Sequence, residues 1–381
     1  MKFLHTSDWH LGMNIKGTAG YEDDQRFAIE NICKIAVDEK VDGILIAGDV
    51  FDKSIAVAQA ISLYDEITTH ICKHLGLPVY IISGNHDSAE RLSQHHELLK
   101  DAGLYVAGSL SKEPYKINRG DVDIFLLPWI STDKVKSVYP EDAEHIISME
   151  DAYKTVLDKY RAEFVKGHKN ILVSHAFIIN AETSVSDRAA EVGTATMVGS
   201  FVFDGFDYVA LGHIHGPQQI NKHIRYSGTP MAYSFGKEEK QEKSVTIFDT
   251  DSLEQKIIPI KQLRKRVTLS GKYSELISAD YDKETENAYV KVVLTDTIIT
   301  LDIMASFREK FPNLLEISGR SFDRPDETIT MTIEEFEDIN KDPKAIFIKY
   351  CEDVLKTVPD AHQLDLFSSA LNNYIEEVTE E

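Results

Sequence analysis

Carboxylate, amide and imidazole side chains recur in five short clusters along this chain. Each cluster follows a short apolar run within a few residues, and in chain order they read Asp-x-His, Gly-Asp, Gly-Asn-His-Asp, Ser-His and Gly-His-x-His. The side chains in them that can bind metal or transfer protons are Asp8, His10, Asp49, Asn85, His86, Asp87, His175, His213 and His215. Oxygen and imidazole donors without thiolates suit manganese or iron better than a structural zinc site. The pattern predicts a dinuclear metal centre, the kind of site that hydrolyses phosphoesters.

Taken one at a time, most of these clusters have an ordinary structural interpretation. Asp8 and His10 could form a turn after a strand, and Gly48-Asp49 is a common turn dipeptide. A lone His175 is more often a core histidine than a ligand. The stretch 84–87 is a stronger signal, because a glycine precedes three consecutive side chains that can bind metal or move protons. The joint occurrence of all the clusters, each after an apolar run, favours the metal centre.

The apolar runs before the clusters are predicted to be the strands that position them. These runs cover residues 2–4, 43–47, 79–82, 171–173 and 208–211. Strands that are buried on both faces have continuous apolar sequences. Sites in open α/β sheets lie beyond the carboxyl ends of the strands. We therefore expect the clusters to meet at one edge of the fold.

Helical spacing of apolar residues alternates with these strands. It is found over 23–37, 56–75 and 148–165, and Ser88 is a candidate N-cap for a helix that runs to about Ala102. Residues 117–128 and 244–259 have the pattern of hairpin strands. This order of elements predicts a layered α/β domain over residues 1–265.

The sequence changes character after this domain. A strand is predicted over 288–294, a helix over 302–310 and a strand over 314–317, which together indicate a small α+β domain over 266–330. A polar stretch, 321–328, follows it. Two amphipathic helices, beginning near Asp342-Pro343 and Asp360, make up the C-terminal region 331–381. Their apolar stripes could pack on the chain's own domain or bind a partner.

Composition limits the possible functions and cellular settings. The net charge of −22 excludes a broadly basic nucleic-acid-binding surface, so any contact with DNA must be local. Cys33, Cys72 and Cys351 are far apart and fit no disulfide or zinc pattern, which indicates reduced thiols in the cytoplasm. The N-terminal residues do not form a secretory signal, and no apolar run is long enough to span a membrane.

On these motifs the chain resembles the calcineurin-like metallophosphoesterases over nearly its whole length. Three strings are similar to the bacterial DNA-repair nuclease branch of that family: His5-Thr-Ser-Asp-Trp-His-Leu-Gly12, Gly48-Asp-Val-Phe-Asp52 and residues 226–235. The resemblance implies a core of two packed β-sheets flanked by helices, a capping domain and C-terminal helices. Asp52 stands where archaeal and eukaryotic relatives usually have histidine, and this departure agrees with a bacterial member.

The resemblance also implies roles for the clustered residues. One cation would be held by Asp8, His10, Asp49 and His215, and the second by Asp49, Asn85, His175 and His213. Asp49 would bridge two divalent cations, with Mn²⁺ expected. His86 would donate a proton to the leaving oxygen, oriented by Asp87, although Asp87 could instead only support the start of a helix. Asp52 is expected to act behind the ligands or as a helix N-cap.

The implied activity is DNA cleavage in repair, recombination and replication. It comprises 3′ to 5′ exonuclease action on double-stranded ends and endonuclease action on single strands and hairpins. Residues 266–330 would guide the DNA, and 331–381 would bind a coiled-coil ATPase subunit. A homodimer through helices near 56–75 and 89–102 is also implied, as part of a heterotetramer. This chain has no phosphate-loop motif, so ATP would act through the partner.

Two other functions remain open on the sequence alone. The same ligands could serve a generic phosphodiesterase or phosphatase that acts on small substrates. The fold could also be kept as a non-catalytic binding scaffold. Cleavage of hairpin DNA compared with small phosphodiesters distinguishes the two enzymes, and a folded chain that binds no metal would indicate the scaffold.

Overall fold

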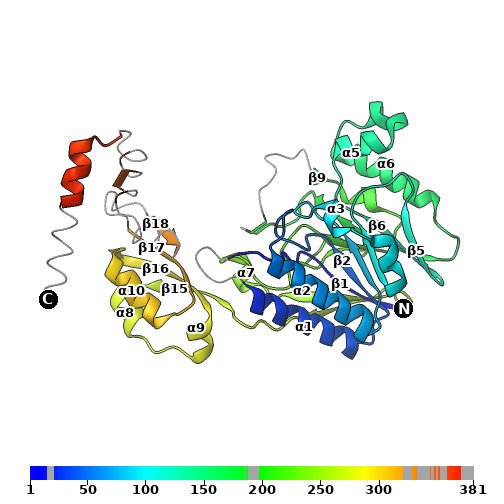
Figure 1. The fold of residues 1–381 in the computed structure, drawn as a ribbon. Coiled ribbons are helices and arrows are strands. Elements are labelled where there is room, and N and C mark those ends of the chain that lie inside the picture. The colour runs from blue at the N-terminus through cyan, green and yellow to red at the C-terminus, as the bar shows by residue number, and fades with distance from the viewer. Residues whose placement is uncertain are drawn as a thin grey trace. The chain divides into compact units, whose positions relative to one another are not determined.

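The computed structural model of the chain divides into two compact units, one up to Thr268 and the other from Leu269 (Figure 1). Each unit has its own sheet structure. The residues that the structure describes are 1–14, 21–184, 186–187, 197–320, 328–332, 344, 347–348, 351 and 358–369.

The first sheet of the larger unit has six strands in the order β14-β13-β1-β2-β3-β4. Their bounds are β1 (Lys2–Thr6), β2 (Gly43–Ala47), β3 (Val79–Ile82), β4 (Leu104–Ala107), β13 (Ser244–Asp249) and β14 (Gln255–Pro259). Strands β1 to β4 are parallel, so their carboxyl ends lie at one edge of the sheet. The predicted hairpin over 244–259 is confirmed, and it extends the sheet beyond β1.

The second sheet of this unit also has six strands, in the order β11-β12-β10-β7-β6-β5. Their bounds are β5 (Tyr115–Arg119), β6 (Val122–Leu127), β7 (Lys169–His175), β10 (Tyr208–Gly212), β11 (Gln218–Gln219) and β12 (Ile224–Tyr226). Strands β6, β7, β10 and β12 are parallel. A short separate pair is formed by β8 (Phe177–Ile178) and β9 (Met197–Val198).

Side chains that alternate between the two faces of each strand form the layers of the larger unit. In β2, Leu45 and Ala47 belong to a core that they share with residues of the second sheet, such as Ile171 and Val173. Ile44 and Ile46 belong to a different core, on the side of α1 (Glu22–Asp38) and α2 (Ala58–Thr69). Successive strand residues point to opposite faces, so each apolar run fills two cores at once.

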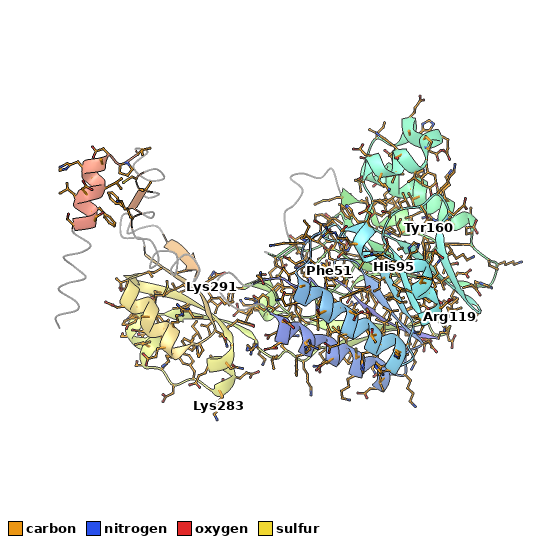
Figure 2. The ribbon with its side chains drawn as sticks, in the orientation of Figure 1. Phe51, His95, Arg119, Tyr160, Lys283 and Lys291 are labelled. Atoms are coloured by element: carbon orange, nitrogen blue, oxygen red, sulfur yellow. The ribbon has the colours of Figure 1, made fainter. Side chains whose placement is uncertain are left out.

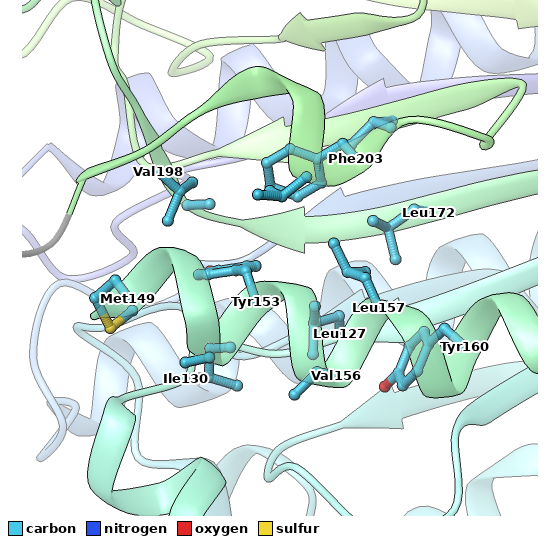
Figure 3. Packing of buried hydrophobic residues seen from close by; sticks show 14 of the residues in the cluster. Leu127, Ile130, Met149, Tyr153, Val156, Leu157, Tyr160, Leu172, Val198 and Phe203 are labelled. Carbon is cyan, nitrogen blue, oxygen red and sulfur yellow. The ribbon is translucent and has the colours of Figure 1, made fainter. Parts of the chain in front are cut away.

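The outer face of the second sheet is covered by α6 (Met149–Ala162). Tyr153, Val156 and Tyr160 of this helix lie in one core with Leu172 of β7 (Figure 3). The helix begins with a capping box, in which Ser148 and Asp151 satisfy each other's backbone N–H groups. The predicted class, two packed sheets flanked by helices, is therefore confirmed.

The remaining helices of the larger unit are short. In the described part of this unit they are η1 (His70–His74), α3 (Ala89–Leu92), α4 (His96–Leu99), η2 (Lys100–Ala102), α5 (Thr132–Val138), η3 (Pro140–His145), η5 (Ser200–Phe203) and α7 (Lys237–Lys240). The prediction of one continuous helix from Ser88 to Ala102 is wrong. His95, labelled in Figure 2, has a φ of 60°, and this left-handed residue separates α3 from α4.

The smaller unit is built on a four-stranded sheet in the order β15-β16-β17-β18. Its elements among the described residues up to Thr332 are β15 (Arg266–Gly271), α8 (Tyr273–Ser278), α9 (Lys283–Asn287), β16 (Tyr289–Ile298), α10 (Leu301–Lys310), β17 (Leu314–Arg320) and β18 (Thr328–Thr332). The predicted strand–helix–strand order is confirmed by β16, α10 and β17. Met304 and Phe307 of α10 are fully buried, as expected for positions three apart on one helix face.

The predicted tether over 321–328 and the two C-terminal amphipathic helices lie mostly outside the described residues. Within them, residues 361–369 are helical, and the ring of Phe367 stacks on Phe347 with centroids 4.4 Å apart. Val358 and Leu366 remain exposed, at 74% and 58%. Among the residues that can be described, no helix has the length and apolar character needed to cross a bilayer.

Candidate metal centre

Asp8, His10 and Asp49 lie in the two loops that follow β1 and β2. Backbone hydrogen bonds join these loops: Asp8 N–H donates to the Gly48 carbonyl and His10 N–H to the Asp49 carbonyl, both at 3.0 Å. The three residues have φ values of 52°, 45° and 49°. Such backbone conformations cost roughly 1–3 kcal/mol each and persist only where the surrounding structure enforces them. The paired loops therefore hold these side chains in directions that the isolated sequence would not favour.

Two glycines allow the other strand ends to approach this pair of loops. A Cβ atom on Gly84 would lie 2.0 Å from Oδ1 of Asp49, and one on Gly212 would lie 1.9 Å from the Ala47 carbonyl oxygen. No side chain fits at either position without displacing backbone or the Asp49 carboxylate. Only glycine fits directly before Asn85 and His213, because neighbouring strands and the Asp49 carboxylate approach the backbone so closely there.

Asp8, His10 and His215 form the first group of donors. Their ligand atoms lie within 4.8 Å of one another, and all three residues are buried. Nε2 of His10 is 3.1 Å from Nε2 of His215. Burial holds the pKa of both imidazoles well below the ordinary histidine value, so both rings are neutral. Two neutral imidazoles whose Nε2 atoms face each other, with the Asp8 carboxylate beside them, fit a shared cation.

Asp49, Asn85, His175 and His213 form the second group. Oδ1 of Asn85 lies 3.0 Å from Nε2 of His175 and 3.0 Å from Nδ1 of His213. Nδ1 of His175 donates to the Ala47 carbonyl at 2.8 Å, which directs Nε2 into the centre. Oδ2 of Asp49 lies 3.4 Å from Nε2 of His175 and 3.8 Å from Nε2 of His10. Asp49 thus stands between the two groups.

The buried charges of the centre determine where protons reside. Burial would raise the pKa of Asp49, but the charge and hydrogen bond of His175 outweigh it and hold that pKa well below its usual range. Burial would lower the pKa of His175, but the Asp49 carboxylate raises it to about 9. Burial, with repulsion from Asp49, raises the pKa of Asp8 to about 8. At neutral pH the metal-free centre therefore holds protons that a cation must displace.

Manganese binding is expected to strengthen as pH rises from about 6 to 9. Below the raised pKa values of Asp8 and His175, of about 8 and 9, protons occupy positions that the cation needs. Each displaced proton lowers the apparent affinity by about tenfold per pH unit below the pKa of its group. Titration calorimetry across this pH range, in buffers of different ionisation enthalpy, measures both affinity and proton release. Affinity that is independent of pH, without proton release, would contradict this account.

His86 lies against the first group of donors. Its ring centroid is 4.9 Å from that of His10, and its backbone N–H donates to Oδ1 of Asp49 at 2.9 Å. Its Nδ1 lies 2.9 Å from the carbonyl oxygen of Asp52 and donates to it. The Asp52 side chain is buried behind His10, with Oδ1 3.9 Å from Nδ1 of that ring. His86 is therefore oriented by the backbone of Asp52.

The expected pairing of His86 with Asp87 is corrected by the structure. The Asp87 carboxylate accepts three backbone N–H groups instead, from Val50 at 3.1 Å, Phe51 at 2.8 Å and Gly84 at 2.9 Å. Adjacent residues in the turn point in different directions, so proximity in sequence did not bring these two side chains together. Asp87 joins the loops after β2 and β3, so its role is structural, but the N–H groups that it accepts lie in these loops and not at the start of a helix, as the alternative had expected.

Replacing Asp87 with alanine is expected to lower the free energy of unfolding by about 3 kcal/mol or more. The variant leaves three largely buried N–H groups without an acceptor, and each such group costs roughly 1–3 kcal/mol. Urea unfolding of the chelator-treated chain measures the change. The exposed Asp101 provides a control, since its replacement by alanine removes a carboxylate that accepts none of these bonds. A loss no larger for Asp87→Ala than for Asp101→Ala would show that the carboxylate does not support the loops.

Several residues around the centre were not predicted from the sequence. The ring of Trp129 stacks on His213 with centroids 5.5 Å apart, and Tyr153 donates to the His175 carbonyl at 2.9 Å. Nε2 of Gln25 donates to the His10 carbonyl at 2.7 Å. Trp129, Tyr153 and Gln25 belong to no motif, so nothing in the sequence marks them. Tyr233, whose ring lies 5.9 Å from that of His10, falls within the string 226–235 and could have been found there.

Comparison with known proteins identifies two families along the chain. Residues 1–217 match the model for calcineurin-like phosphoesterase, and residues 261–354 match SbcD_C, described as the type 5 capsule protein repressor C-terminal domain. The SbcD subunit of the nuclease SbcCD from Staphylococcus epidermidis is 31% identical over 342 residues, which are 89% of this chain and 90% of that protein.

Two solved structures are more distant. TT1561 of Thermus thermophilus is 14% identical with a TM-score of 0.39, and the match covers 68% of this chain and 99% of that one. A dimetal phosphatase from Danio rerio is 11% identical with a TM-score of 0.36, covering 68% and 99% respectively. These scores are too low to add to the family assignment.

Proposed function

Because the chain belongs to the calcineurin-like phosphoesterase family, we propose that it is the nuclease subunit of an SbcCD-type complex and hydrolyses DNA phosphodiester bonds. The observation that carries this proposal is the convergence of polar residues from five strand ends on one buried cluster, with Asp49 between two groups of donors. A phosphoesterase that acts through a pair of cations needs this kind of arrangement.

The proposed site holds two divalent cations, with manganese favoured by the mixture of nitrogen and oxygen donors. One cation is assigned to Asp8, His10, Asp49 and His215, and the other to Asp49, Asn85, His175 and His213. When bound, the cations supply positive charge to the phosphate oxygens and lower the pKa of water for attack on phosphorus. The position of Asp49 between the groups supports its role as the shared ligand.

His86 is the proposed proton donor to the leaving oxygen. The Asp52 carbonyl accepts from Nδ1 at 2.9 Å and fixes the ring, which leaves Nε2 to deliver the proton. The ring lies beside His10 and is only partly buried, so substrate can reach it. Asp87 acts indirectly, by holding the loop from which His86 projects.

The proposed substrates are double-stranded DNA ends, hairpins and single strands, cleaved by 3′ to 5′ exonuclease and endonuclease action. Residues 1–265 form the proposed nuclease domain, and residues 266–330 the domain that guides DNA through backbone contacts, which position the substrate without reading its sequence. The net charge of −22 means that binding depends on local basic residues and on the bound cations.

The test compares substrates with the full chain and manganese. Cleavage of hairpin DNA and of duplexes with blocked ends, with little hydrolysis of bis(p-nitrophenyl) phosphate, is expected. Hydrolysis of the small diester without cleavage of DNA would favour a generic phosphodiesterase. A folded chain that binds no manganese in calorimetry would favour a non-catalytic scaffold.

The C-terminal region 331–381 is the proposed binding site for the ATPase subunit SbcC. The described part supports this, because Val358 and Leu366 are exposed although Phe347 and Phe367 stack on each other. Exposed apolar side chains beside a packed pair suit a protein partner. Copurification of the full chain with SbcC tests the proposal, and a failure to associate at micromolar concentrations would refute it.

A homodimer within a heterotetramer is proposed through α2 and the α3–α4 segment. Ile61 and Leu98 on these helices are 51% and 73% exposed, which supports a contact with a second copy. Sedimentation of the purified chain measures the assembly. A cytoplasmic location is also proposed, since Cys33, Cys72 and Cys351 are free thiols.

A further inference from the structure

His215 makes a hydrogen bond on the side of its ring that faces away from His10. Nδ1 of His215 lies 2.6 Å from the hydroxyl oxygen of Ser186, and that hydroxyl in turn contacts Oε1 of Glu238. A carboxylate can only accept, so the Ser186 hydroxyl donates to Glu238. The Ser186 oxygen must then accept from His215, which requires the tautomer with hydrogen on Nδ1. This tautomer leaves the lone pair of Nε2 directed toward His10, 3.1 Å away.

The acceptor at the end of this chain of hydrogen bonds is held firmly. The Glu238 side chain is fully buried, and its Oε1 also accepts from the Ser234 hydroxyl at 2.8 Å. Its Oε2 accepts from the Tyr233 backbone N–H at 2.9 Å and from Nζ of Lys243 at 3.0 Å. A buried carboxylate is tolerated only when it is paired and hydrogen-bonded in this way. Glu238 is therefore fixed as an acceptor toward Ser186.

Lys243 connects Glu238 to the backbone of the same histidine. Its buried ammonium donates to the carbonyl oxygen of His215 at 2.9 Å and to the Thr229 hydroxyl at 2.7 Å, as well as to Glu238. The direct separation between Nδ1 of His215 and Oε1 of Glu238 is 3.9 Å, too long for a hydrogen bond. The Ser186 hydroxyl spans this gap. The ring of His215, through Ser186, and its backbone carbonyl are thus both hydrogen-bonded to the Glu238–Lys243 ion pair.

We propose that Ser186, Glu238 and Lys243 are positioning residues that fix the tautomer and direction of His215. The inference rests on the proposed function, because it treats His215 as a metal ligand. Histidines that bind metals usually donate their second ring nitrogen to a carboxylate, a carbonyl or water, and this bond sets which nitrogen faces the metal. Here a serine hydroxyl transmits the effect of a carboxylate that cannot reach the ring itself.

The test replaces Ser186 with alanine in the full chain. Nitrogen-15 NMR of histidine-labelled, metal-free protein, with His215 assigned by comparison with His215→Gln, is expected to show the Nδ1–H tautomer in the parent and its loss in Ser186→Ala. Titration calorimetry with manganese is expected to show an affinity about 10–100-fold weaker, as found when outer hydrogen-bond partners of metal ligands are removed.

Ser234→Ala is the matched control, because Ser234 donates to the same carboxylate oxygen but does not contact His215. It should leave both the tautomer and the manganese affinity unchanged. An unchanged tautomer in Ser186→Ala, or an equal loss of affinity in Ser234→Ala, would overturn the inference. Failure of the proposed function would look different: the parent would not bind manganese, while the NMR comparison would still decide whether Ser186 sets the tautomer.

Discussion

Replacing His86 with alanine is expected to reduce kcat for DNA cleavage by about 10²–10⁴-fold, the usual contribution of a general acid, while metal binding is retained. The ring is oriented through Nδ1 by the Asp52 carbonyl, so the variant loses the group that would protonate the leaving oxygen. Its backbone N–H remains available to Asp49. Single-turnover cleavage at saturating manganese, together with elemental analysis of bound metal, separates the two effects.

His145 provides a control for this experiment. It is an exposed histidine of η3, outside the donor groups and the proposed dimer contact, and its replacement by alanine should leave cleavage unchanged. His86, His10 and Asp49 also form a group whose ligand atoms lie within 4.8 Å. If His86→Ala lost bound metal, His86 would therefore be a ligand and its assignment as proton donor would be wrong.

Replacing Asp49 with asparagine is expected to weaken the binding of both cations together and to abolish detectable cleavage. The carboxylate is buried, and its Oδ2 lies 3.4 Å from His175 and 3.8 Å from His10, one from each group of donors. An amide supplies one neutral oxygen in place of two charged ones, so it cannot serve two cations. Calorimetric titration with manganese should show a lower affinity in both binding steps. The loss should exceed the roughly 10–100-fold that follows removal of a hydrogen-bond partner of a metal ligand.

Asp52→Asn is the corresponding control. Asp52 is also a buried aspartate near His10, but its hydrogen bond with His86 is made by the backbone carbonyl, and the substitution keeps that carbonyl. We expect two manganese ions to remain bound to this variant. If one cation bound to Asp49→Asn with parental affinity, Asp49 would belong to a single metal and the shared site would have to be abandoned.

The sheets and the clustering of polar residues could be predicted because they follow from local pattern. Apolar runs such as 43–47 are buried on both faces, and parallel strands bring their carboxyl ends to one edge. The sequence does not contain an equally local signal for the hydrogen bonds of Ser186 and Glu238, which are 52 positions apart. Long-range contacts of this kind depend on how the loops fold back, which only the three-dimensional structure reveals.

The sequence does not reveal where the conformation of a single turn sets the direction of side chains or ends a helix. His86 and Asp87 are adjacent, but the carboxylate of Asp87 faces backbone N–H groups and the ring of His86 faces Asp52. The helix expected from Ser88 was interrupted because His95 adopts a left-handed conformation that helical periodicity does not reveal. In both cases the backbone conformation of one turn decided the result, and composition alone carries little information about it.

Four of the eight non-glycine residues with positive φ in the described chain are Asp8, His10, Asp49 and His213. Glycine would relax each of these positions, because it adopts positive φ without steric cost. Selection for thermal tolerance of the metal-free chain should therefore enrich glycine at the residues that would chelate metal, and selection for catalysis should remove it. Laboratory evolution of a more thermostable variant would need manganese in the medium throughout, so that thermal stability and catalytic activity are selected together.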